Sequence, residues 1–202
     1  MNNSLKPGRL VAVIGKRERL RPALSAEFPA GPGCAVLPEA IPCDPSLSIR
    51  DNVQQLRMMA PAEDSALFEA LLALTGLEQH RGWKRPFRGD MTAEKKLYAV
   101  FAAMLPKPET LLIYDVPAEM NAAQRAAFAQ MAERFCGSGS ALVYTASDLK
   151  SVMQLELRQE IWLPGPDGFR KTDAEAIAES SAMLLTPGER NAYYRELEAG
   201  EI

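Results

Sequence analysis

Leu111-Leu-Ile-Tyr114 is an uninterrupted apolar run between two breaks in the pattern of the chain. A run of this length, bounded by loop-forming residues, is typical of a strand that is covered on both faces of a sheet. The same pattern occurs at Leu10-Val-Ala-Val-Ile14, which ends at Gly15 and precedes the helix-forming stretch 16–28. Pro22 within that stretch fits a helix only in its first turn. We expect the two strands to lie in one sheet and to pair with each other in parallel.

Apolar runs and helical patterns alternate over the rest of the chain as well. The runs predict strands at 34–37, 141–145 and 160–163, with a turn at 164–168 that leads into Phe169. Spacing and composition predict helices over 64–77, 97–105, 121–135 and 148–157, and a buried helix that ends at Met58-Met59. This alternation predicts an α/β fold in which a mostly parallel sheet is flanked by helices.

Length and composition fit one folded domain over residues 1–202. Hydrophobic residues make up 47% of the chain and charged residues 24%, which excludes wholesale disorder and a fibrous repeat. Within the domain we expect a small helical lobe at about 47–105 and a C-terminal helical extension at about 173–202.

Charge and cysteine content narrow the classes of partner and compartment. With 23 Lys and Arg against 26 Asp and Glu, the net charge of −3 gives no electrostatic reason to expect nucleic acid or an anionic bilayer. The three cysteines cannot all pair, and with a single histidine they do not form a zinc-binding pattern. No run of about 18 apolar residues occurs. We therefore expect a cytoplasmic protein without a membrane span, whose contact with any membrane is made through a partner.

Four segments, by their order and spacing, resemble the ATP-binding domain of ABC transporters over roughly residues 9–172. Leu47-Ser-Ile-Arg-Asp-Asn-Val53 is similar to the family segment after the Q-loop, and Phe68–Leu77 is similar to a helix that follows it. Pro108–Pro117 resembles the Walker B strand, and Ala141–Leu149 resembles the strand that ends in the switch histidine. The resemblance implies a shortened P-loop NTPase fold of the ABC ATPase type.

The end of the chain carries a narrower resemblance. The turn Leu163-Pro-Gly-Pro-Asp-Gly-Phe169, before a helix that is expected to start near Asp173, is similar to the ATPases of capsular and O-antigen polysaccharide exporters. This resemblance implies a bacterial protein that works in envelope polysaccharide export.

The resemblance also assigns a P-loop, and its chemistry departs from the family pattern. The pattern G-x-x-x-x-G-K-[ST] begins at Gly15, but Leu20 replaces the second glycine, Arg21 the lysine and Pro22 the hydroxyl that would hold Mg²⁺. Leu20 does not readily adopt positive φ, and Pro22 has neither a hydroxyl nor an N–H group. The backbone cradle for phosphate is therefore expected to be lost.

Other positions of the implied nucleotide site also lack the residues that the family uses for ATP hydrolysis. Glu39 falls on the Q-loop glutamine, Val116 replaces the catalytic glutamate after the retained Asp115, and Ser147 replaces the switch histidine. The signature segment must lie within 89–96, where no two glycines are adjacent. Only 18 positions separate Arg21 from Glu39, so we expect no counterpart of the antiparallel subdomain that supplies an adenine-stacking aromatic in the family. We therefore predict a protein that is not an enzyme, needs no cofactor or metal, and neither binds nor hydrolyses ATP.

The sequence supports a non-enzymatic role as a first hypothesis. It predicts a pseudo-ATPase subunit or regulator that acts with a membrane permease or an intact ATPase subunit of a polysaccharide export or synthesis system. The partner surface is expected at Arg50, Asp51, Trp83 and Phe87, a pattern of aromatic and charged residues suited to docking a helix. Two alternatives remain open, an atypical nucleotide-binding ABC ATPase subunit and a stand-alone cytosolic scaffold.

A structural role competes with the functional one at several positions. Trp83 and Phe87 are either anchors for a partner or core packing beneath the helical lobe. The basic stretch 16–21 is either an anion site or a solvated helix face. Asp115 is either a site residue or an inherited hydrogen-bonding residue, and His80 is expected on the surface.

Overall fold

A computed structural model describes residues 5–15, 17–31, 33–37, 43–60, 64–89, 91–114, 120–165 and 168–172 of the protein. Its strands are β1 (Leu10–Ile14), β2 (Cys34–Val36), β3 (Thr110–Ile113), β4 (Ala141–Ala146), β5 (Glu160–Gly165) and β6 (Gly168–Thr172). Its helices are α1 (Arg17–Glu27), α2 (Ile49–Met59), α3 (Ser65–Thr75), the 3₁₀ helix η2 (Leu77–Gln79), α4 (Thr92–Met104), α5 (Ala122–Gly137) and α6 (Leu149–Met153).

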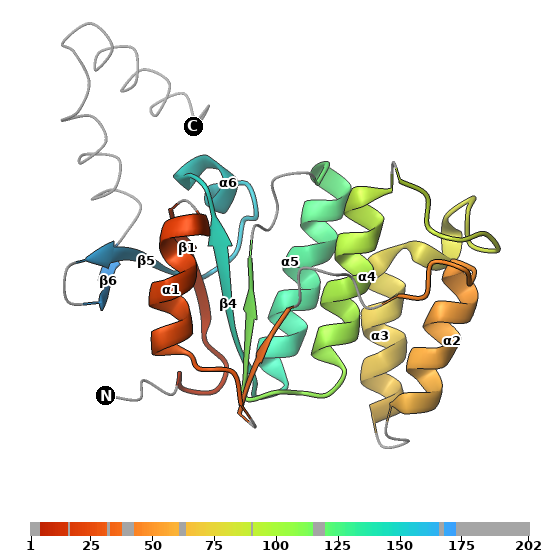
Figure 1. The fold of residues 1–202 in the computed structure, drawn as a ribbon, viewed down its shortest axis with the longest axis horizontal. Coiled ribbons are helices and arrows are strands. Elements are labelled where there is room, and N and C mark those ends of the chain that lie inside the picture. Colours follow the sequence, from red (N-terminus) through yellow and green to blue (C-terminus); the bar gives the residue numbers. More distant parts are fainter. Residues whose placement is uncertain are drawn as a thin grey trace, which may run out of the picture.

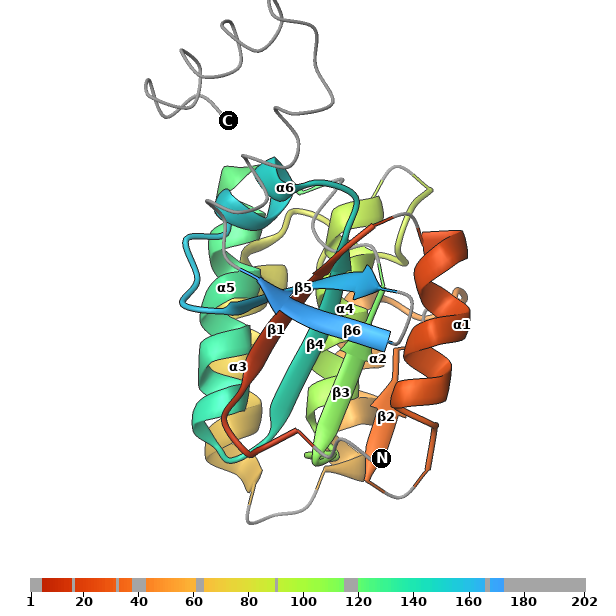
Figure 2. The same ribbon diagram turned by 90° about the vertical axis from the view of Figure 1, so that its left-hand side faces the viewer.

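The six strands form one sheet in the order β2-β3-β4-β1-β5-β6. All neighbours are parallel except β5 and β6, which form an antiparallel hairpin. The predicted α/β fold with a mostly parallel sheet is therefore confirmed, and Figure 2 shows the sheet with its β5–β6 edge nearest the viewer.

The expected direct pairing of the 10–14 and 111–114 strands is wrong. β4 lies between β1 and β3 and pairs in parallel with both. The physical reason is the crossover from β3 through α5, which places the next strand of the chain, 141–146, beside 110–113. An apolar run shows that a strand is buried, but it does not show which strand is its neighbour.

Side chains alternate along the central strands between two hydrophobic clusters. Val11 and Val13 point to one face of the sheet, where Leu20, Leu24 and Phe28 of the α1 segment cover them. Residues of opposite parity point to the other face, which α5 and α4 cover, with α3 and α2 farther out (Figure 1). Both faces of the central strands β1, β3 and β4 are therefore buried, as their continuous apolar runs predicted.

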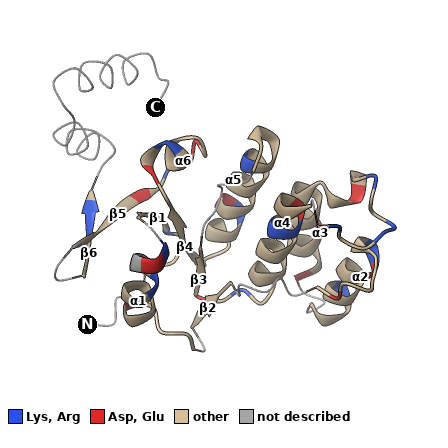
Figure 3. Ribbon diagram, turned by 45° about the horizontal axis from the view of Figure 1, so that its top comes forward, with Lys and Arg blue, Asp and Glu red and all other residues tan. Residues whose placement is uncertain are grey.

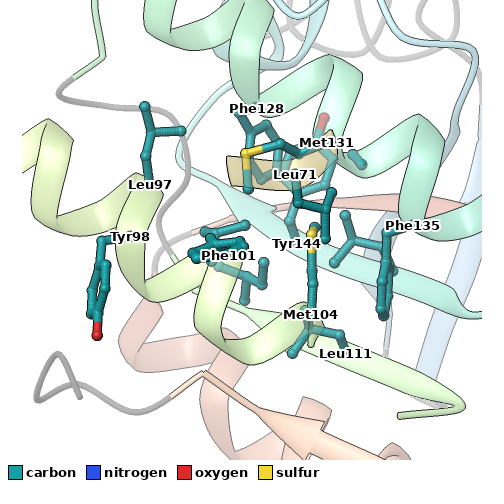
Figure 4. Close-up of a cluster of buried hydrophobic side chains, with 14 of the residues drawn as sticks. Leu71, Leu97, Tyr98, Phe101, Met104, Leu111, Phe128, Met131, Phe135 and Tyr144 are labelled. Atoms are coloured by element: carbon teal, nitrogen blue, oxygen red, sulfur yellow. The ribbon is translucent and has the colours of Figure 1, made fainter. Parts of the chain in front are cut away.

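Aromatic and methionine side chains fill the larger cluster between the sheet and the helices (Figure 4). The ring of Phe128 meets that of Tyr144 edge to face, with the centroids 5.8 Å apart. The rings of Phe68 and Phe101 pack in the same manner at 5.1 Å. Since Phe68 lies on α3 and Phe101 on α4, this contact joins the outer helices to those that touch the sheet.

Two helix boundaries have the local causes that the sequence indicates. Asn121 and Gln124 form a reciprocal capping box at the start of α5, with N–H to side-chain oxygen distances of 3.0 Å in both directions. α3 ends at Gly76, whose φ of 66° is the left-handed conformation that glycine adopts without strain.

Three local expectations differ from the structure. Pro22 lies inside α1 rather than in its first turn. It is exposed there. Residues 164, 165 and 168 of the predicted turn at 164–168 belong to strands β5 and β6, and Phe169 lies in β6, a strand that the sequence did not predict. Met58 and Met59 end α2 but are 75% and 80% exposed, since the apolar side of α2 turns Ile49 and Val53 inward instead.

Two negative findings hold for the described ranges. No helix there is both long and apolar enough to cross a membrane. No group of three or more His, Cys, Asp or Glu side chains there is arranged to hold a metal ion. The expected C-terminal helical extension at about 173–202 lies outside the described residues, and the division into one domain with a lobe at about 47–105 stays a prediction.

Candidate functional site

The P-loop position of the fold is occupied by the start of a regular helix. Gly15 follows β1 with a φ of 153°, and its N–H group donates to the carbonyl of Ala146 at 2.9 Å. α1 begins at Arg17, so Leu20, Arg21 and Pro22 are all helical. A helix directs its N–H groups along its axis, whereas a phosphate cradle directs several of them toward one centre.

The side chain of Leu20 fills the space beside Gly15. Leu20 is fully buried, and a methyl group added to Gly15 would meet its Cδ2 atom at 3.1 Å and its Cγ atom at 3.3 Å. Leu20 belongs to the cluster that also contains Val13 and Leu24. An apolar side chain therefore lies where the resemblance assigns the second glycine of the P-loop, and it anchors α1 to the sheet.

Arg21 and Pro22 face outward from the same helix. Both are exposed, and Pro22 offers no N–H group. On the neighbouring turn, the guanidinium of Arg17 lies over the ring of Tyr114, 5.6 Å from its centroid. The basic residues of α1 that the structure describes are thus placed on the surface of the helix.

Ser147, the predicted counterpart of the switch histidine, takes part in a helix cap. Its hydroxyl donates to a carboxylate oxygen of Asp148 at 2.7 Å, and the second oxygen of Asp148 accepts the N–H of Ser151 at 2.8 Å at the start of α6. Burial raises the pKa of Asp148, but these hydrogen bonds and the charge of Lys150 outweigh it and leave the pKa lowered. Ser147 and Asp148 therefore serve to cap the N-terminus of α6.

The remaining predicted positions of the nucleotide site are Glu39, Asp115 and Val116, which lie outside the described residues. Gly15 and Ser147 follow the neighbouring parallel strands β1 and β4, so the fold brings both to the carboxyl edge of the sheet. In parallel α/β folds this edge is where ligands bind.

The predicted partner residues come together at the N-terminus of α2. The N–H groups of Ile49 and Arg50 donate to the carbonyls of Arg85 and Trp83 at 2.9 and 3.0 Å. The hydroxyl of Ser48 accepts the N–H of Asp51 at 3.1 Å. Since a helix leaves its first N–H groups unsatisfied, the 83–85 segment and Ser48 complete this helix end. Arg50 and Asp51 thus lie beside Trp83.

Trp83 and Phe87 are half-buried and pack against the larger hydrophobic cluster. The centroid of the Phe87 ring lies 5.4 Å from that of Tyr98. Tyr98 is buried, and this burial, with a smaller effect of Cys43, raises its pKa to about 12. The two aromatic residues therefore contribute to the core while remaining partly exposed, and Trp83 lies beside the charged start of α2.

Asn52 is a structural residue that the sequence-based reasoning did not single out. It is 1% exposed, its Oδ1 atom accepts the N–H of Asp44 at 2.7 Å, and its Nδ2 group donates to the carbonyls of Asp44 and Ser48 at 3.0 Å. It thereby fixes the loop that leads into α2. The available signal was an amide one turn into a helix after a loop rich in Asp, Pro and Ser.

Among the comparisons with known proteins, solved structures alone bear on the fold. No protein-family model matches the chain, and no curated protein matches it in sequence. A solved ATP-binding subunit of an ABC transporter superposes with a TM-score of 0.62 at 15% identity, covering 96% of this chain and 89% of that subunit. An inward-facing ABC transporter described as of the metal-chelate type superposes with a TM-score of 0.54 at 16% identity, covering 86% and 75%. The chain is thus similar in fold to the ATP-binding subunits of ABC transporters.

Proposed function

We propose that this protein is a catalytically inactive, ABC ATPase-like subunit or regulator that works through a protein partner. The observation that carries the proposal is the packing of Leu20 against Gly15. Leu20 belongs to a helix that begins at Arg17, two residues after that glycine. ATP hydrolysis on this fold needs a loop of backbone donors, a lysine and a magnesium ligand around the phosphates. Here a helix and a buried leucine stand in their place.

Calorimetry with Mg-ATP on the full chain tests the loss of nucleotide binding. We expect no saturable heat at millimolar nucleotide and no release of phosphate, because the P-loop position lacks the cradle. A dissociation constant in the micromolar range would overturn the proposal. It would favour the alternative that the protein is an atypical nucleotide-binding ABC ATPase subunit.

The partner that we propose is a membrane permease or an intact ATPase of a bacterial envelope polysaccharide export or synthesis system. The support is the resemblance of the 163–169 segment to polysaccharide exporters, together with the surface where Arg50 and Asp51 lie beside Trp83. In this proposal the protein is cytoplasmic and reaches the inner membrane through that partner. Copurification from detergent-solubilised membranes tests it, since a stand-alone cytosolic scaffold would be recovered without membrane proteins.

A further inference from the structure

The loop between η2 and α4 borders a cavity that is open to solvent and carries three arginine side chains in its lining. The cavity has a volume of about 500 Å³ and is lined by Arg81, Arg85 and Arg88, with His80, Met91 and Glu94. We propose that it binds a small anion that carries two or more phosphate or carboxylate groups. This inference goes beyond the proposed function and does not depend on it.

Backbone hydrogen bonds hold the loop in a defined shape. The N–H of Trp83 donates to the carbonyl of His80 at 2.9 Å, that of Arg85 to Gly82 at 2.7 Å, and that of Met91 to Arg88 at 3.2 Å. The Nδ1 atom of His80 accepts the N–H of Gly82 at 2.9 Å. Successive turns therefore fix the Cα positions from which the three arginines extend around the cavity.

Positive charge is concentrated at this place in an otherwise acidic protein. Residues 81–96 contain six of the 23 Lys and Arg residues but only two of the 26 Asp and Glu residues. Figure 3 shows this charge along the loop between α3 and α4 and at the start of α4. The carboxylate of the cavity, Glu94, already accepts a hydrogen bond from Nε2 of Gln124 at 3.2 Å.

Two of the guanidinium groups are available to a ligand. The side chains of Arg81 and Arg85 form no ion pair or hydrogen bond with any residue in the described ranges. A guanidinium group binds phosphate or carboxylate through two parallel hydrogen bonds, and like charges held close together favour an anion between them. A cavity of this volume accepts a small molecule rather than a folded domain.

Calorimetric titration of the full chain at low ionic strength tests the site, with magnesium-free pyrophosphate and citrate as separate probes. We expect saturable binding of at least one of them, weakened tenfold or more in Arg81→Gln/Arg85→Gln. Raising the ionic strength to about 1 M, where the Debye length falls to about 3 Å, should also abolish it because the arginines are exposed. Comparison of the two probes tells whether phosphate or carboxylate is preferred.

Arg158→Gln is the matched control, because Arg158 is an exposed arginine outside this cavity. It should leave binding unchanged. The carbonyl of Arg85 that caps α2 remains in Arg85→Gln, so thermal melting should show that the double variant keeps its fold. Absence of saturable binding of both probes at millimolar concentration, or an equal loss in Arg158→Gln, would overturn the inference. Mg-ATP, in which the metal neutralises two charges, should give no saturable heat in the same titration.

Discussion

At the scale of single residues, Leu20 shows how one side chain is used by the fold instead of by a nucleotide site. It is fully buried between α1 and the sheet. Replacing it by glycine would restore one letter of the P-loop pattern. We expect Leu20→Gly to lower the free energy of unfolding by about 4 kcal/mol, from the cavity and the added helix flexibility. Urea denaturation measures this change.

Arg21→Lys is the control for this substitution, because it also restores a letter of the P-loop pattern. Arg21 is exposed, so the free energy of unfolding should change by no more than about 0.5 kcal/mol. Equal effects of the two substitutions would contradict the structural role assigned to Leu20.

Asn52 carries a second prediction at this scale. Asn52→Ala removes the acceptor of the Asp44 N–H and the donor to two carbonyls in a buried position. Since a buried polar group without a partner is costly, we expect a loss of about 2 kcal/mol or more in the free energy of unfolding. Gln55→Ala, at an exposed position of the same helix, should change it by less than about 0.5 kcal/mol. Indistinguishable urea midpoints for the two variants would refute the role of Asn52.

At the scale of elements, one carboxylate links β5 to the start of β1. Glu160 accepts a hydrogen bond from Nε of Arg9 at 3.0 Å and from Nε1 of Trp162 at 3.3 Å, and Nζ of Lys171 on β6 lies at 3.6 Å. The hydrogen bond from Arg9 lowers the pKa of Glu160, and burial opposes this only in part. The charged form is therefore favoured in the folded state.

This lowered pKa predicts the pH dependence of stability. A carboxyl whose pKa is lower in the folded state stabilises the fold above its ordinary pKa of 4.5, and the stabilisation is lost as the pH falls through the folded value. We expect Glu160→Gln to be less stable than the wild type at neutral pH and to lose less stability on acidification. Thermal melting across the acidic range measures both effects. Glu133→Gln, at an exposed position of α5, should follow the wild-type curve.

At the scale of the whole molecule, the predicted partner residues and the predicted nucleotide-site residues are different sets, and they make opposite predictions. Arg50 is exposed at the start of α2, and only its backbone N–H is needed to cap that helix. We therefore expect Arg50→Glu to abolish copurification of the membrane partner while melting at the wild-type temperature. Asp115→Asn, at the predicted Walker B position, should copurify the partner as the wild type does.

Trp83→Ala should weaken the same copurification, since truncation of an interface anchor costs about 2 kcal/mol of binding or more. Because Trp83 also packs against the core, this variant should be less stable as well, and Arg50→Glu is the cleaner test. If Asp115→Asn lost the partner and Arg50→Glu kept it, the predicted nucleotide site would be the place that carries the function.

The sequence by itself determined the class of fold and most of its local elements. Continuous apolar runs fixed the buried strands β1, β3 and β4, because both faces of a parallel sheet need apolar side chains. The capping pair Asn121 and Gln124 and the terminator Gly76 marked helix ends, because these signals depend only on residues a few positions apart. Strand β6 was missed, since its residues Gly168–Thr172 are mainly exposed or polar and are held by pairing with β5.

Only the tertiary structure decided which distant segments meet. The neighbours of β1 depend on the crossover through α5. The N-terminus of α2, at Ile49 and Arg50, is completed by carbonyls that lie more than thirty residues later in the chain. The position of the Leu20 side chain was also decided by tertiary packing. The sequence pattern marked Leu20 only as a departure from a P-loop, whereas the fold places its side chain against Gly15. Local patterns fix backbone conformation, whereas burial and hydrogen bonding between distant segments depend on the close packing of the whole chain.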